Sequence, residues 1–157
     1  MNNFISFLRE NHIEFLQNEP LAKHSTFRIG NTVSVAVFPD TTEKIVSVIG
    51  FLKSNGTEFL VLGKGSNVLF PDRDIEYPII FTEKAAEIKR TGENTVSAEA
   101  GATLSRVAAF GITQGLGGFE FASGIPGTVG GAVVMNAGAY GKNISDVLVR
   151  SEYIGAD

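Results

Sequence analysis

The sequence predicts an α+β protein made of two lobes. Residues 1–82 alternate helix-like and strand-like patterns, whereas residues 83–157 combine short strands, one helix and a long glycine-rich stretch. Glycine supplies 18 of the 157 residues, about 11% against an average of ~7%. We therefore expect an α/β first lobe over residues 1–82 and a second lobe over residues 83–157.

Composition and charge exclude several classes of function. The 13 basic and 17 acidic residues give a net charge of −4, which excludes the basic footprint typical of nucleic-acid binding. With no cysteine and two histidines, the chain is not expected to use thiol chemistry or a histidine-rich metal centre. No apolar run approaches the ~20 residues of a membrane span, and the N-terminus does not resemble a signal peptide. We expect a cytoplasmic protein with no metal site and no nucleic-acid or membrane partner.

The first lobe is predicted to begin with an amphipathic helix over residues 3–17, which Pro20 stops. Residues 21–30 are expected to form a loop. The β-branched and aromatic residues of 33–38 predict a strand that ends at Pro39. The apolar side chains on the helical face are Phe4, Phe7, Leu8, Phe15 and Leu16.

A second helix and two short strands complete the predicted first lobe. Asp40, followed three residues later by Glu43, matches a capping box at the start of a helix. The apolar residues 59–62 predict a buried strand, and residues 68–70 resume an extended apolar run. Between them lies the glycine loop 63–67.

The elements from residue 77 onward are predicted from shorter patterns. Residues 77–81, 86–89 and 95–100 are expected to form short strands, and Thr103 to cap a helix that runs through Gln114. Residues 145–154 return to strand character. Because a last strand without a partner leaves an unpaired edge, we expect the second lobe to be incomplete and the protein to continue beyond it.

The loop 63–67, Gly-Lys-Gly-Ser-Asn, is a candidate anion site. Successive main-chain N–H groups in glycine turns can form an anion-binding nest, to which Ser66 and Asn67 add donors. The spacing matches neither a P-loop nor the G-x-G-x-x-G dinucleotide fingerprint. On spacing alone, a tight turn between two strands explains the loop better than a phosphate-binding role does.

A second glycine-rich segment follows in the other lobe. Residues 101–141 hold 11 of the 18 glycines, and no charged residue occurs between Glu120 and Lys142. A ligand there would be held by main-chain N–H groups and small side chains. Two such surfaces suggest a large ligand with an anionic middle and a flat end, as in a flavin dinucleotide.

Three motifs then closely resemble the UDP-N-acetylenolpyruvoylglucosamine reductase family of bacterial cell-wall enzymes. They are Leu-Gly-Lys-Gly-Ser-Asn-Val-Leu at 62–69, Ser-Gly-Ile-Pro-Gly-Thr-Val-Gly-Gly-Ala at 123–132 and Met-Asn-Ala-Gly-Ala-Tyr-Gly at 135–141. The early loop His-Ser-Thr-Phe-Arg-Ile-Gly at 24–30 matches as well, except that Asn31 stands where the family usually has a second glycine. The resemblance runs over essentially the whole chain.

The resemblance implies a two-lobed FAD-binding fold of the vanillyl-alcohol-oxidase (PCMH) type, with the C-terminal substrate domain absent here. It implies non-covalent FAD, NADPH as hydride donor and a nucleotide-sugar substrate used in peptidoglycan biosynthesis, with the loop 63–67 on the FAD pyrophosphate. The cofactor-binding residues it implies are Gly63, Lys64, Gly65, Ser66, Asn67, Val68, Ser123, Gly124, Ile125, Pro126, Gly127, Thr128, Gly130, Gly131, Asn136, Gly138, Ala139, Tyr140 and Gly141.

The same resemblance assigns no catalytic residue to this chain. The family's catalytic arginine, proton-donating serine and late glutamate all lie C-terminal to the residues present, so we expect the chain alone not to turn over substrate. Two alternatives stay open: the FAD-binding lobes of another oxidase or dehydrogenase of this fold, and a non-enzymatic nucleotide-binding module. The oligomeric state is not predicted. His24 is expected to be a packing or surface residue without a carboxylate partner.

Overall fold

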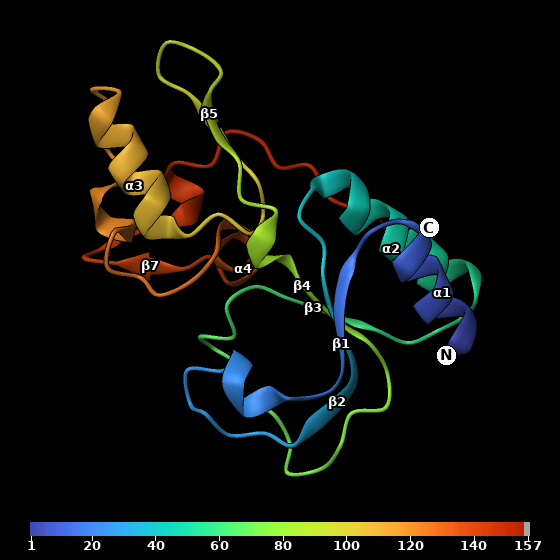
Figure 1. Cartoon of the computed structure of the whole chain (residues 1–157). Coiled ribbons are helices and arrows are strands. Elements are labelled where there is room, and N and C mark those ends of the chain that lie inside the picture. Colours follow the sequence, from blue (N-terminus) through green and yellow to red (C-terminus); the bar gives the residue numbers. More distant parts are fainter. Residues whose placement is uncertain (156–157) are drawn as a thin grey trace.

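A computed structural model describes residues 1–155, and its first part is built on a four-stranded sheet (Figure 1). The strand order is β1-β2-β4-β3, with β1 antiparallel to β2 and the other three strands parallel. The parallel strands therefore end at one shared edge of the sheet. The strands are β1 (Glu14–Pro20), β2 (Thr32–Phe38), β3 (Leu60–Leu62) and β4 (Ile79–Phe81).

Two helices, α1 (Asn2–Glu10) and α2 (Thr42–Ser54), pack together beside this sheet. Their apolar faces form one core cluster with β2 and β4, in which Leu8, Val48 and Leu52 are fully buried. The residues that follow β1 and β3 form a second cluster around Leu21 and Phe70. The sheet is thus held between two apolar layers, which fixes the edge where its parallel strands end.

The prediction of one helix over residues 3–17 is wrong in its second half. The helix α1 ends at Glu10, and the side-chain amide of Asn11 donates to the carbonyl oxygen of Phe7 at 2.8 Å. His12 then has a positive φ of 49°, which a continuing helix does not allow. Residues 14–20 instead form β1, because all of them except Asn18 pair with β2 in an antiparallel ladder.

Four smaller expectations in the first part also need correction. The strand predicted to be buried at residues 59–62 forms as β3, but its Leu60 and Val61 are exposed. The side chain that caps α2 is that of Thr41, one residue after Asp40, and it accepts from the main-chain N–H of Lys44 at 3.2 Å. The predicted loop 21–30 begins with a short 3-10 helix, Leu21–His24. Residues 68–70 join no ladder within the described chain.

The second part contains a hairpin, two helices and short turns, and it lies beside the first part in Figure 1. The third core cluster of the molecule lies in this second part and surrounds Leu104 and Phe121. Thr103 caps α3, as predicted, by accepting from the N–H of Arg106 at 3.4 Å. The elements are the 3-10 helix Thr82–Lys84, β5 (Ile88–Arg90), β6 (Val96–Ala98), α3 (Leu104–Thr113), the 3-10 helix Glu120–Ala122, α4 (Val129–Met135), β7 (Gly138–Ala139), β8 (Lys142–Asn143) and the 3-10 helix Ile144–Asp146.

The predicted strand over residues 145–154 is not formed. A 3-10 helix ends at Asp146, and residues 147–155 pair with no strand of the described chain. The side chains of Val149 and Tyr153 are 84% and 86% exposed. The β-branched and aromatic residues that predicted this strand therefore pack against no apolar surface of residues 1–155. A strand needs a ladder partner, and none lies beside these residues.

No helix within residues 1–155 is long and apolar enough to cross a membrane. The longest, α2, has 13 residues, against the ~20 that a membrane span needs.

A pH-dependent contact joins the start of β2 to the segment before β4. The Asp74 carboxylate accepts from the hydroxyl of Thr32 at 2.6 Å and from its N–H at 3.1 Å, and these bonds lower the pKa of Asp74 below its usual 3.8. A carboxyl group whose pKa falls on folding stabilises the fold above its unfolded-state pKa. This stabilisation is lost as the pH falls through the folded-state pKa.

We therefore predict that Asp74→Ala lowers the free energy of unfolding at neutral pH and has a progressively smaller effect in acid. Chemical denaturation at a series of pH values measures this difference. The control is Asp72→Ala, because the Asp72 carboxylate makes no hydrogen bond or ion pair with residues 1–155. A loss of stability that is the same at every pH contradicts the prediction.

Candidate functional site

The loop Gly63–Asn67, called the nest below, follows β3 at the edge where the parallel strands end. Within the described residues, the main-chain N–H groups of residues 64–67 donate to no protein acceptor. Ligands of sheets with parallel strands characteristically bind beyond the carboxyl ends of those strands. Consecutive unpaired N–H groups at that edge are the donor set that an anionic group needs.

The early loop of the chain holds the nest in shape. Gly65 has a φ of +63°, and its carbonyl oxygen accepts from the N–H of Thr26 at 3.2 Å. A Cβ on Gly65 would lie 2.0 Å from the carbonyl oxygen of His24, so a side chain does not fit there. The hydroxyl of Ser25 donates to the carbonyl oxygen of Val68 at 3.2 Å, just beyond the nest.

The second glycine segment meets the nest directly. A Cβ on Gly63 would lie 2.1 Å from the hydroxyl oxygen of Thr128, and one on Gly127 would lie 3.6 Å from the hydroxyl oxygen of Ser66. Thr128 is 1% exposed and caps α4, accepting from the N–H of Gly131 at 3.5 Å. Two predicted segments that lie about sixty residues apart in sequence therefore form one surface.

The third predicted segment, residues 136–141, lies elsewhere. It begins at the far end of α4, whose seven residues span about 10 Å. The side-chain oxygen of Asn136 accepts from the N–H of Ser145 at 2.9 Å, and Tyr140 is 92% exposed at the tip of the β7–β8 turn. Thr128, which contacts the nest, and Asn136 therefore lie at opposite ends of α4.

Several predicted site residues have structural neighbours of their own. Val68 and Ile125 are half-buried and pack against apolar clusters. The N–H of Gly130 donates to the carbonyl oxygen of Ala100 at 2.9 Å. The hydroxyl of Ser123 donates to the main-chain carbonyl oxygen of Glu120 at 2.8 Å. The exposed members are Lys64, Asn67, Ser123, Gly124, Pro126, Gly131, Asn136, Gly138, Tyr140 and Gly141, while Ala139 is half-buried. Their contact with a cofactor stays a prediction.

The structure shows a supporting pair that the sequence reasoning missed. The Nε2 atom of His24 lies 3.1 Å from Oε1 of Glu19, a residue only 8% exposed, and the His24 ring lies 4.6 Å from the ring of Phe81. The expectation that His24 has no carboxylate nearby is therefore wrong. Glu19 lies at the end of β1 and His24 in the 3-10 helix that follows Pro20. The chain bends between them, and neither helical nor strand periodicity in the sequence predicts such a contact.

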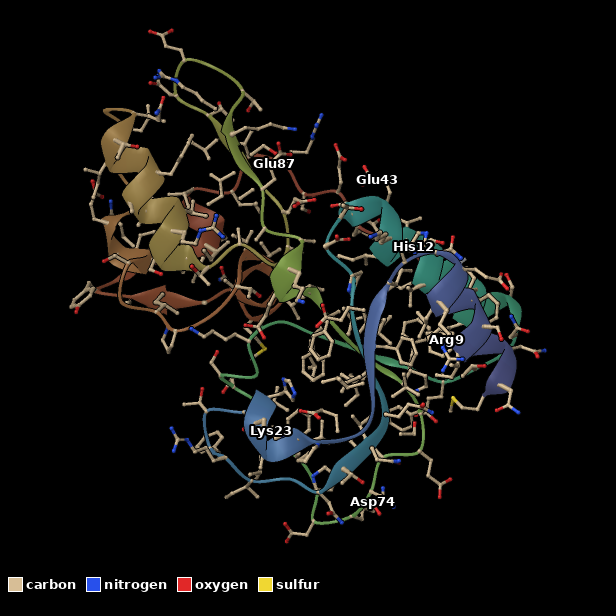
Figure 2. All side chains as sticks on the ribbon, viewed as in Figure 1. Arg9, His12, Lys23, Glu43, Asp74 and Glu87 are labelled. Carbon is tan, nitrogen blue, oxygen red and sulfur yellow. The ribbon has the colours of Figure 1, made fainter. Side chains whose placement is uncertain are left out.

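A separate hollow of about 430 Å³ opens between the two parts, and it is lined neither by the nest nor by residues 123–141. Four carboxylates line it, against two cationic side chains, so its charge does not favour an anionic ligand. Figure 2 shows Glu43 at the start of α2 and Glu87 at the β5–β6 hairpin, on opposite sides of this hollow. Its lining residues are Asp40, Thr41, Glu43, Lys84, Ala86, Glu87, Glu99 and Arg106.

The nest and the segment facing it have the chemistry that a nucleotide cofactor needs. Lys64 is the single charged residue between positions 59 and 71, and residues 121–141 carry no charged side chain. Unpaired N–H groups at the nest suit a pyrophosphate, and an uncharged surface beside it suits a flat ring system. Among residues 1–155, no group of three or more histidine, aspartate or glutamate side chains is arranged to hold a metal ion. Fold and site together define a nucleotide-cofactor-binding protein.

Comparison with known families makes this assignment specific. A family model described as "FAD binding domain" matches residues 33–157, and the chain belongs to this family. FAD is therefore the cofactor, and the unpaired N–H groups of the nest fit its pyrophosphate.

The chain is also similar to curated UDP-N-acetylenolpyruvoylglucosamine reductases. It is 44% identical over 151 residues to that of Caldicellulosiruptor bescii, which covers 96% of this chain and 48% of the relative. It is 46% identical over 141 residues to that of Clostridium botulinum, which covers 90% of this chain and 46% of the relative. The chain thus spans about half the length of the curated relatives it matches.

Solved structures confirm the predicted α+β, PCMH-type fold. The reductase of Thermus caldophilus superposes with a TM-score of 0.61 at 27% identity, over 85% of this chain and 46% of that one. An alkyldihydroxyacetonephosphate synthase gives a TM-score of 0.66 over 88% of this chain and 32% of its own, at 17% identity. The latter likeness concerns the fold alone.

The contact between Gly63 and Thr128 generates a stability prediction. We expect Gly63→Ala to lower the free energy of unfolding by about 1–3 kcal/mol, because the new methyl group overlaps Thr128 and forces the two parts apart. Thermal or urea denaturation measures the change. The penalty should shrink in a Thr128→Ala background, which removes the overlapping hydroxyl.

The matched control is Gly50→Ala in α2, where a Cβ has no neighbour within 4 Å. This change should raise stability by about 0.5–1 kcal/mol, because alanine favours the helix. If both glycine substitutions stabilise the chain, the close contact at Gly63 is wrong.

Proposed function

We propose that this chain is the FAD-binding part of an NADPH-dependent UDP-N-acetylenolpyruvoylglucosamine reductase, which forms UDP-N-acetylmuramate for peptidoglycan in the cytoplasm. The observation that carries the proposal is the nest, which faces Thr128 across the contact at Gly63 and has four successive N–H groups without an acceptor among residues 1–155. The 44% identity to curated reductases favours this activity over other flavin enzymes of the same fold, which are about 17% identical.

Within this proposal, the nest binds the pyrophosphate of FAD through the N–H groups of residues 64–67. The Ser66 hydroxyl and the Asn67 amide add donors, and the Gly127–Thr128 segment lies against the bound cofactor beside the nest. Residues 136–141 contact a more distant part of the same molecule, beyond α4. Bound there, FAD would supply the hydride-transfer chemistry between NADPH and the enolpyruvyl double bond of the nucleotide sugar.

We also propose that residues 1–82 and 83–157 are the two lobes that enclose this cofactor. Two features support the boundary: the last strand of the four-stranded sheet ends at Phe81, and the third core cluster draws only on residues from Leu104 onward. The chain alone is expected to bind FAD without turning over the nucleotide sugar, because it spans about half the length of its curated relatives.

Binding of FAD tests the proposal directly. Titration of FAD with the purified chain, followed by flavin fluorescence and visible absorption, should give saturable one-to-one binding. ADP should compete, and riboflavin should bind much more weakly, because the nest contacts the pyrophosphate. Ser66→Ala should weaken FAD binding about tenfold. The variant loses one hydrogen bond to a charged group, and such a bond contributes roughly 1.5 kcal/mol to binding.

The control variant is Ser47→Ala, which alters an exposed serine on α2 away from the nest and should leave the affinity unchanged. Absence of saturable FAD binding contradicts the proposal. Riboflavin that binds as tightly as FAD contradicts the role of the nest.

A further inference from the structure

Glu99 follows β6 in the second part of the molecule, yet its carboxylate bonds to the first part. Its Oε1 atom accepts from the hydroxyl of Thr42 at 2.7 Å and from the N–H of Thr42 at 3.3 Å. Its Oε2 atom accepts from the N–H of Glu87 at 2.7 Å. The main-chain N–H of Glu99 donates in turn to the carbonyl oxygen of Glu87 at 2.9 Å. One side chain therefore ties the β5–β6 hairpin to the start of α2.

Thr42 is the first residue of α2, so its N–H is one of the donors that have no partner inside the helix. Thr41 already satisfies the N–H of Lys44, and Glu99 satisfies that of Thr42. A negative charge at this position also interacts favourably with the positive end of the helix dipole. The start of α2 is thus capped from both parts of the molecule.

This contact is one of several along the edge where the parallel strands end. After β3, Gly63 meets Thr128, and after β4, a Cβ on Gly101 would lie 1.8 Å from the carbonyl oxygen of Thr82. After β2, the contact is the bond between Glu99 and Thr42. Contacts at separate points of one edge prevent the second part from rotating relative to the first. The Gly63 contact alone would allow such a rotation.

The surroundings of Glu99 indicate that hydrogen bonds hold its carboxylate. Within residues 1–155 it forms no salt bridge. It lines the hollow between the two parts, and the charged groups that line it too are Asp40, Glu43, Glu87, Lys84 and Arg106. The other three carboxylates of the hollow repel the negative charge of Glu99. The position of the Glu99 carboxylate is therefore set by its three hydrogen bonds.

We propose that Glu99 is a positioning residue for the cofactor: by joining the hairpin to α2, it sets how closely the Gly127–Thr128 segment approaches the nest. This inference rests on the proposed binding of FAD at the nest. Glu99 itself touches neither the nest nor the cofactor in this scheme. Its effect on affinity passes through the orientation of the second part.

A double-mutant cycle tests this role. Glu99→Ala should weaken FAD binding about tenfold, and Thr42→Val should weaken it less, because the N–H of Thr42 still donates. The double variant should bind like Glu99→Ala alone. Glu99→Gln keeps one acceptor oxygen for Thr42 and should recover part of the affinity, and it also serves if the alanine variant folds poorly. Glu93→Gln, which removes an exposed charge at the tip of the same hairpin, should change nothing.

Amide hydrogen exchange supplies a readout that does not need FAD. In Glu99→Ala, the amides of Thr42 and of residues 127–131 should exchange faster, while the amides in the middle of α2 should keep their protection. Unchanged FAD affinity in Glu99→Ala, or unchanged exchange at residues 127–131, overturns the inference and leaves the proposed function standing. Failure of the unaltered chain to bind FAD overturns both.

Discussion

The approach of Gly63 to Thr128 is the constraint on which the rest of the site depends. At this point the main chain that leaves β3 lies against a buried threonine of the second part, with no room for a Cβ. Because Gly63 is the first residue of the nest, the same contact sets the position of the unpaired N–H groups against the uncharged segment. Thr128 also caps α4, so the contact orients the helix that leads to residues 136–141.

The rest of the fold keeps this contact in place from several directions. The two apolar layers around the sheet fix the ends of β2, β3 and β4. The early loop supports the nest through Thr26 and Ser25, and the pair of Glu19 and His24 anchors that loop beneath it. The nest therefore owes its shape to residues that come almost forty positions before it, as well as to its own glycines.

Local features of this fold follow from the sequence, and contacts between distant residues do not. The cap at Thr103, the β5–β6 hairpin and the glycine loop after the short strand β3 are encoded by residues next to one another. The segment 14–17 is apolar enough for either helix or strand, and the ladder with β2 decides it. No spacing indicates that Glu99 reaches Thr42 or that Thr128 reaches Gly63. The resemblance grouped residues 136–141 with the nest, but α4 separates them.

Amide chemical shifts, followed by nuclear magnetic resonance while FAD is added to the chain, give the most direct test of the site. The largest changes are expected at residues 64–67, with further changes at Gly127 and Thr128. Largest changes around Lys84 and Arg106, in the charged hollow, with the nest unaffected, would contradict the placement of the cofactor at the nest.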